Sequence, residues 1–202
     1  FRLDAEIVRD SALAASDLLT EKLGGPSVFP PQPASVAAAA YGNTKWDVSK
    51  GEDRYRRSLY TFSKRTAPFA AYLTFDGPTG EACIAQREVS NTPLQALTLM
   101  NDEMFTEAAV ALADSTLSGL GHNPVESEKV AAEIFRRILT REPDQSELTD
   151  LVNYYESQLA RLKSGELAPE KISGQEAATP AQAAWAMVAR VILNLDEAVT
   201  KG

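Results

Sequence analysis

The feature that most constrains the fold is a set of helix-start signatures in the second half of the chain. Thr92-Pro93-Leu94-Gln95 and Thr179-Pro180-Ala181-Gln182 each place Thr at an N-cap, Pro at the first helical position and Gln at the third. Asn123-Pro124-Val125-Glu126 has the same form, and Asp144-Gln145-Ser146-Glu147 lacks only the proline. In such a capping box the cap oxygen accepts a backbone N–H while the Gln or Glu reaches back. The sequence therefore predicts helices near 93–118, 125–140, 145–163 and 180–198, with Asn101-Asp102 as the point where the first can break.

The beginning of the chain carries one further helical pattern. Leu3, Ile7, Ala14 and Leu18 recur at helical spacing and predict one apolar stripe on an amphipathic helix. We expect Gly24-Gly25-Pro26 to end this helix, because glycine readily adopts the left-handed C-cap conformation.

An irregular segment follows this helix. The region 26–53 opens with a proline-rich run and is predicted to be a long surface excursion fixed by Trp46. Residues 54–66 fit both helical and alternating spacing, and we favour helix there. Turn residues punctuate 67–90, where we expect irregular structure with a short strand around Tyr72–Phe75. Together these patterns predict a single all-α domain over 1–202, with about five or six helices and a long irregular segment between the first helix and residue 92.

Charge and hydropathy exclude two classes of partner. Net charge is −8; residues 1–101 hold 11 acids and 11 bases, whereas residues 102–202 hold 17 acids and 9 bases. Such an acidic chain is a poor nucleic-acid binder, because neutralising phosphates requires clustered Lys and Arg. No run of about 18 apolar residues occurs, so we expect no direct membrane insertion.

The chain lacks a complete catalytic or metal signature. His122 is the only histidine and is predicted to lie exposed in a loop between helices, without further ligands spaced around it. Cys83 is the only cysteine, and we expect it to be buried and inert. No Cys-x-x-Cys-His occurs, so this chain does not itself attach c-type haem. We therefore predict no catalytic residue, no metal site and no cofactor in this chain.

Residues 54–102 are the best candidate for a binding surface because they interleave bases and aromatics before a polar run. Arginine forks bind carboxylates, sulfates or phosphates, and aromatic faces stack on sugars. The candidate binding residues are Arg56, Arg57, Tyr60, Arg65, Asp76, Arg87, Asn91, Asn101 and Asp102. A structural interpretation, which we favour, places the aromatics in the core and pairs the arginines with the acidic second half.

Four stretches of the chain are similar to one family. They read RLDAEIVRDSALAASDLL with GGPSV, RRSLYTFSKRTAP, FDGPTGEACIAQREVSNTPLQALTLMND, and AWAMVARVILNLDEAV. They resemble the planctomycete surface domain, a domain of unknown function (number 1553), in its C-terminal portion. The run from Arg87 to Asp102 is the most specific part, and Arg57, Arg87, Asn91, Asn101 and Asp102 occupy the family's polar signature positions. Stretches 26–53 and 164–178 are expected to be variable surface insertions.

The resemblance implies a setting but no reaction. It implies a C-terminal fragment of a larger exported protein, an extracytoplasmic location, and c-type haem on another domain of the parent; the start without Met agrees with a fragment. We expect a non-catalytic interaction module that docks upstream domains of the same polypeptide or contacts polysaccharide. Two alternatives remain: part of a shared active site in a haem-linked oxidoreductase or carbohydrate-processing enzyme, and a structural surface-layer component.

Overall fold

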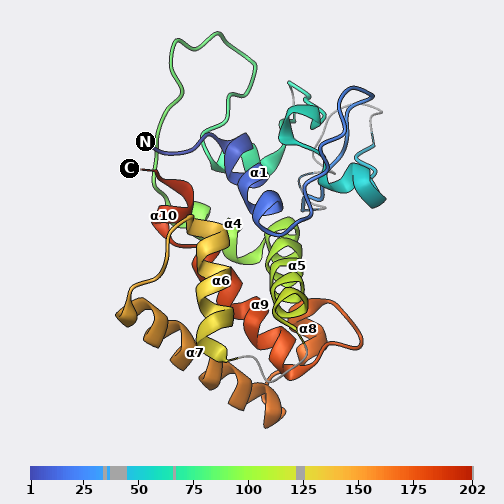
Figure 1. Ribbon diagram of the computed structural model, residues 1–202. Coiled ribbons are helices and arrows are strands. Elements are labelled where there is room, and N and C mark those ends of the chain that lie inside the picture. Colours follow the sequence, from blue (N-terminus) through green and yellow to red (C-terminus); the bar gives the residue numbers. More distant parts are fainter. Residues whose placement is uncertain (34–35, 37–44, 66, 122–125, 202) are drawn as a thin grey trace.

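The computed structural model describes residues 1–33, 36, 45–65, 67–121 and 126–201, and its regular elements are helices (Figure 1). They are α1 (Ala5–Ala15), η1 (Gly51–Tyr55), η2 (Ser58–Tyr60), α3 (Ala70–Thr74), α4 (Pro93–Asn101), α5 (Glu103–Leu120), α6 (Ser127–Leu139), α7 (Gln145–Lys163), α8 (Pro169–Ser173), α9 (Pro180–Leu193) and α10 (Asp196–Val199); η1 and η2 are 3-10 turns. Six of the helices in these ranges have seven or more residues, and no strand occurs in them. The predicted all-α class is confirmed.

The second half of the chain forms a helical bundle around α5 and α9. These two helices pack against each other along much of their length, and α9 also packs against α7, α8 and α6 (Figure 1). Both bury several alanines, among them Ala108, Ala109, Ala186 and Ala189, and small side chains allow close approach of helix axes. The Trp185 ring stacks on Tyr155 with their centroids 3.8 Å apart. Burial of this apolar surface is the main source of the bundle's stability.

Three of the four predicted helix starts are confirmed as capping boxes, at Thr92, Asp144 and Thr179. The fourth begins at Asn123, outside the described residues, and its helix runs from Ser127 rather than 125. The break predicted at Asn101-Asp102 is also confirmed. Asp102 is extended, and its carboxylate accepts the Met104 N–H at 3.0 Å, so it caps α5.

The N-terminal part of the chain covers one end of the bundle, and both chain ends lie together there (Figure 1). The Leu3 N–H donates to the Val199 carbonyl and the Lys201 N–H to the Phe1 carbonyl, each at 2.8 Å. Helix α1 packs on α5, α6, α3 and η2. This arrangement places α1 between the bundle and the irregular segment.

The first helix is shorter and turned differently from the prediction. It ends at Ala15, where the buried Ser16 hydroxyl donates to the Ala12 and Leu13 carbonyls, well before Gly24. Its buried stripe is Ala5, Val8, Arg9, Ala12 and Leu13, whereas the predicted Ile7 is 44% exposed. The prediction failed because two apolar stripes lie side by side on this helix, and the sequence does not show which one faces the bundle.

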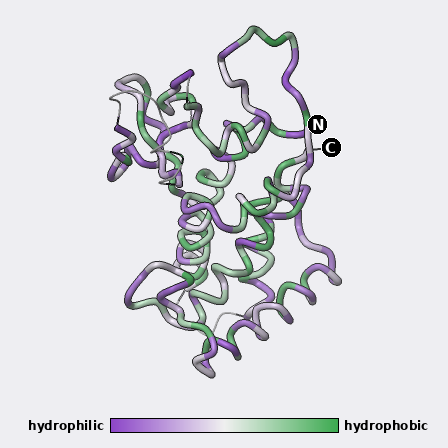
Figure 2. The backbone as a smooth tube through the Cα atoms, turned by 180° about the vertical axis from the view of Figure 1, so that it is seen from behind, coloured by the Kyte–Doolittle hydropathy of each residue, from purple (hydrophilic) through white to green (hydrophobic). Residues whose placement is uncertain are grey.

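Three local predictions in the irregular segment need correction. The helix predicted over 54–66 does not form in the described residues 54–65, which contain the end of η1 and all of η2, because their backbone bonds largely to distant segments. The strand expected around Tyr72–Phe75 is the helix α3. Cys83 is exposed, on a loop that projects beyond the chain ends and is apolar near its tip (Figure 2).

Aromatic packing fixes the proline-rich excursion, as predicted for Trp46. The Trp46 Nε1–H donates to the Pro30 carbonyl at 2.7 Å, and its ring stacks on Phe69. Phe29 stacks on Phe62 with ring centroids 4.9 Å apart. The described parts of 26–53 therefore pack against Phe62 and Phe69, later in the irregular segment. Within 164–178, α8 packs on α9 and α5.

Candidate functional site

The basic cluster of residues 54–65 divides between interior and surface. Arg56 is completely buried, and its guanidinium donates to the Lys22, Gly24 and Pro26 carbonyls. The same guanidinium lies 3.8 Å from the centroid of the Tyr60 ring, a cation–π geometry. The Tyr60 hydroxyl accepts the Gly24 N–H at 2.9 Å. Arg56 and Tyr60 thus hold the loop that follows α1.

A second buried arginine works in the same way. Arg9 in α1 is 2% exposed and donates to the Arg54 and Arg56 carbonyls and to the Ser58 hydroxyl. Its nearest carboxylate is that of Asp10, at 3.6 Å. Burial lowers the pKa of Arg9, because desolvation disfavours the charged form. Among the described ion pairs of the arginines in 54–102, only those of Arg54 reach the acidic second half as predicted, through Glu103 and Glu107.

The projecting loop, residues 76–90, is held at its two ends by side chains that include Ser90 and Gln95 of the family-specific run from Arg87 to Asp102. Asp76 has a positive φ of 59°, and its carboxylate accepts from the Ser90 N–H and hydroxyl at 2.8 Å. Buried Gln95 donates to the Thr74 carbonyl and accepts from Arg2 at 2.7 Å. These bonds fix residues 76–90 as a closed loop on α3 and α4.

Arg87 attaches the same loop to α1. Its guanidinium forms a bidentate pair with Glu6, at 2.6 and 3.1 Å, and lies 3.5 Å from Asp4. Burial of the Glu6 carboxyl raises its pKa, but the hydrogen bond and charge of Arg87 outweigh this effect, so the pKa is lowered. The pair joins residues 81 positions apart in the sequence.

A pocket of about 460 Å³ opens where α1, η2 and α3 meet, and we call it the α1 pocket. Its charged lining residues are Asp4, Glu6, Asp10, Arg57 and Arg87, and its apolar ones include Ile7, Leu59, Phe62, Phe69 and Tyr72. Asp10 accepts the Ser58 N–H at 2.8 Å and lies 3.9 Å from Arg57. The pocket therefore combines charges of both signs with an apolar floor, a lining suited to specific binding.

The structure brings only two of the nine predicted binding residues, Arg57 and Arg87, to this pocket. Arg65 and Asn91 are exposed elsewhere, and the Asn101 amide donates to the Leu97 carbonyl of its own helix. Asp102 is half-buried at the start of α5, and burial raises its pKa. The sequence did not lead us to predict the three carboxylates of the pocket. Their signal is the placement of Asp4, Glu6 and Asp10 around Ile7, outside the stripe that packs on the bundle.

Two larger grooves along α5 have less suitable linings. One, of about 550 Å³, has four serines in its lining, and both oxygens of its Asp114 accept from the side-chain amides of Gln175 and Gln182. The other, of about 530 Å³, borders Gly121, next to residues outside the described ranges. Their larger volume does not by itself favour them, because the two charged groups in the lining of the first groove, Glu107 and Asp114, are already hydrogen-bonded to other side chains.

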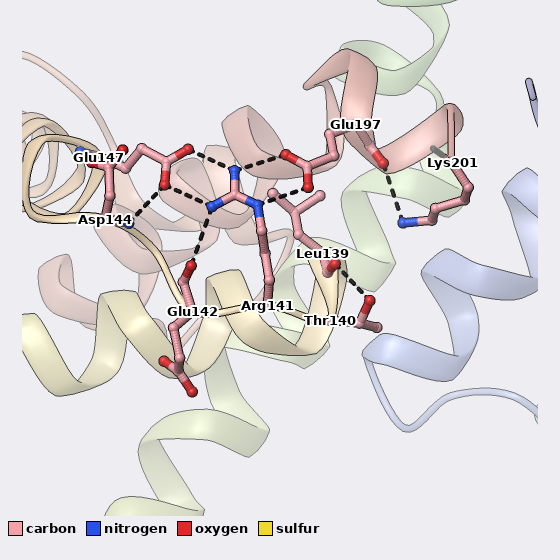
Figure 3. A network of polar contacts seen from close by, with 8 residues as sticks. All are labelled: Leu139, Thr140, Arg141, Glu142, Asp144, Glu147, Glu197 and Lys201. Atoms are coloured by element: carbon pink, nitrogen blue, oxygen red, sulfur yellow. Dashed lines mark hydrogen bonds and ion pairs between the residues drawn. The ribbon is translucent and has the colours of Figure 1, made fainter.

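An ion-pair network just after the C-terminal end of α6 is structural (Figure 3). The Arg141 guanidinium binds Glu147 at 2.7 and 2.8 Å and Glu197 at 2.8 Å, and its pKa is raised by these hydrogen bonds. Arg141 thereby connects the turn before α7 with α10. This network resembles a clamp between elements rather than a binding site, because each carboxylate is occupied by the same guanidinium.

The described residues contain no group of three or more His, Cys, Asp or Glu side chains placed to hold a metal ion. His122 lies outside the described ranges, so its predicted exposure stays a prediction. Among the helices described, none is long and apolar enough to cross a membrane.

Comparison with known proteins identifies a family. No curated protein and no solved structure matches the chain significantly. One family model matches residues 1–155, which include the α1 pocket, the projecting loop and the bundle as far as α7. Its description is PSD1, protein of unknown function (DUF1553). Because the match covers more than half of the sequence, this chain belongs to the PSD1 (DUF1553) family.

Proposed function

We propose that this chain is a non-catalytic docking module of a larger exported protein, and that the α1 pocket is its contact surface. The partner is another part of the same polypeptide. The observation that carries the proposal is the pocket itself, whose lining combines exposed Leu59 and Ile7 with five charged side chains. Apolar surface with a polar rim is typical of interaction sites.

The setting rests on the resemblance to exported planctomycete proteins. On that basis the module lies outside the cytoplasm, and a c-type haem belongs to a different domain of the parent. The chain's single cysteine fits that division, since covalent haem attachment requires a Cys-x-x-Cys-His motif.

The alternative of a shared active site has less support. Asp102 has a raised pKa, but it caps α5 and does not line the α1 pocket. Asp76 is engaged by Ser90, and Asp196 is an exposed partner of Arg2. These carboxylates do not converge on one cavity among the described residues, whereas paired catalytic carboxylates do.

The proposal is tested by adding the remainder of the parent polypeptide to this chain as a separate protein. A partner that binds the folded state raises the melting temperature, by an amount that grows with its concentration. Leu59→Glu should abolish the rise, because it places a charge on the apolar floor. Leu94→Glu is the matched control, since Leu94 is 60% exposed on α4, away from the pocket.

The outcomes separate the candidate functions. A rise that Leu59→Glu removes and Leu94→Glu keeps supports docking through the α1 pocket. A rise with polysaccharide alone replaces the partner domain by a glycan. A rise with calcium alone favours the surface-layer role. No rise with any of them overturns the docking role.

A further inference from the structure

We propose that the α1 pocket binds a peptide segment in which a lysine or arginine is flanked by aliphatic residues. This inference rests on the proposed docking function and names the chemistry of the partner. Three features of the pocket carry it: exposed aliphatic side chains, carboxylates with unused acceptors, and one exposed guanidinium.

The exposed apolar side chains of the pocket lining favour aliphatic contacts over stacking on a sugar. Leu59 is 74% exposed and Ile7 is 44% exposed, so both offer apolar surface to a partner. The aromatic rings are already engaged with one another, because Phe62 stacks on Phe29 and Phe69 on Trp46. Sugar binding relies on open aromatic faces, whereas aliphatic side chains need only apolar area.

Two carboxylates have acceptor capacity left for a ligand: that of Asp4, the N-cap residue of α1, and that of Asp10 within α1, whose side chain is 14% exposed. The Asp4 side chain is 59% exposed, and its nearest cation is Arg87 at 3.5 Å. Asp10 uses Oδ1 for the Ser58 N–H, while its Oδ2 lies 3.9 Å from the Arg57 Nε. Among the described residues, no hydrogen bond reaches the Asp4 carboxylate or Oδ2 of Asp10. Both residues lie three positions from Ile7, one before it and one after it.

The cations around the pocket leave room for a further one. Arg87 is already engaged by two carboxylates, Glu6 and Asp4. Arg9 lies close to Asp10 but donates its hydrogen bonds to the Arg54 and Arg56 carbonyls and to Ser58. The pocket lining thus has three carboxylates against two guanidiniums.

A basic peptide matches all of these groups at once. The methylene stem of a lysine can lie along Leu59 and Ile7 while its ammonium reaches Asp4 or Asp10. Arg57, with 46% of its side chain exposed, can donate to a peptide carbonyl. A neutral polysaccharide supplies hydroxyl groups but neither the cation nor the aliphatic surface.

The test uses fluorescein-labelled peptides with a Leu-Lys-Leu centre, and versions with norleucine or glutamate in place of the lysine. Binding to the full chain is followed by fluorescence anisotropy. The lysine peptide should bind about tenfold more tightly than the norleucine one, the difference expected for a charge-assisted hydrogen bond. The glutamate peptide should not bind. Raising the salt concentration should weaken the lysine complex.

Variants locate the site. Asp4→Asn combined with Asp10→Asn should lower the lysine peptide's affinity about tenfold, because both side chains keep their shape but lose charge. Asp150→Asn, on the exposed face of α7, is the matched control and should change nothing. Leu59→Asn provides a second variant, which removes apolar surface from the pocket without adding a charge and should weaken binding of the lysine and norleucine peptides alike. A thermal melt of each variant checks that it folds.

Equal affinity for the lysine and norleucine peptides would overturn this inference, and so would an equal effect of Asp150→Asn. If no peptide binds but the parent polypeptide still raises the melting temperature through Leu59, docking stands and the basic-peptide ligand is wrong. If neither binds, both proposals are wrong.

Discussion

The bundle and the N-terminal layer, defined as residues 1–33, 45–65 and 67–92, reach stability by different means. In the bundle, α5, α6, α7 and α9 bury a continuous apolar core, and their backbone bonds close within each helix. In the N-terminal layer the backbone outside α1 and α3 is irregular, and buried guanidiniums bind several of its carbonyls. A segment without regular structure must find partners for its buried polar groups, since an unpaired one is costly.

This difference explains why the basic cluster resembles a binding surface in the sequence although part of it is buried in the structure. Arginines next to aromatics in a sequence suggest a surface for anions or sugars. Arg56 instead lies on Tyr60 inside the layer, with three carbonyls as acceptors. An arginine carries five donors in a planar fork and can bind several loop carbonyls at once. It thereby supplies the hydrogen bonds that a helix or sheet would otherwise provide.

The largest effect is expected for Arg56→Ala, which should lower the free energy of unfolding of the N-terminal layer by about 3 kcal/mol. The change removes the hydrogen bonds to the Lys22, Gly24 and Pro26 carbonyls and the cation–π contact with Tyr60. The chain has two tryptophans, Trp46 in this layer and Trp185 in the bundle. Denaturant unfolding followed by fluorescence in Trp46→Phe and Trp185→Phe backgrounds therefore reports on each region separately.

Arg65→Ala is the control, because Arg65 is exposed, and it should stay within about 0.5 kcal/mol of the parent chain. A larger loss of unfolding free energy in the Trp46 signal than in the Trp185 signal would support the contrast between the two regions. Equal losses would show one cooperative unit, and a loss no greater than that of Arg65→Ala would contradict the role assigned to Arg56.

A smaller effect is expected for Thr179→Ala, which removes the capping oxygen at the start of α9. The free energy of unfolding should fall by about 1 kcal/mol, chiefly in the Trp185 signal. Thr149→Ala removes an exposed threonine within α7 and serves as the control. If Thr179→Ala were as mild as Thr149→Ala, the capping box would contribute little to the bundle.

The smallest effect concerns pH. The hydrogen bond from Arg141, followed by that from the Asp144 N–H, lowers the pKa of Glu147 to about 2. Because the folded-state pKa is below the unfolded value of 4.5, this contribution is present above pH 4.5 and is lost as pH falls toward 2. Solvent screening limits it to about 1 kcal/mol or less.

Urea unfolding at several pH values checks this contribution. Glu147→Gln should flatten the acid side of the stability profile while keeping an acceptor for the Asp144 N–H. Glu156→Gln, on the exposed face of the same helix, should leave the profile as it is. An unchanged profile for Glu147→Gln would show that the Arg141 network contributes nothing measurable.

Local rules were sufficient for some elements and not for others. Thr92, Asp144 and Thr179 could be assigned as caps, because a capping box is complete within four residues. The end of α1 at Ala15 and the outward position of Ile7 could not, since they depend on contacts with α5, α6 and η2. The candidate site was half predictable: Arg57 and Arg87 stand out in the sequence, but Asp4 and Asp10 join them only when α1 meets η2.

The sequence by itself determined the helical class, three helix starts, the break at Asp102 and the family, because each depends on short patterns of caps and apolar spacing. Only the tertiary structure decided which arginines are buried, where Cys83 lies, and which side chains surround the α1 pocket. Those outcomes depend on pairings between residues tens of positions apart, such as Arg87 with Glu6 and Arg56 with Gly24. Such pairings are set by how packed elements exclude water from particular side chains, and no local pattern encodes that exclusion.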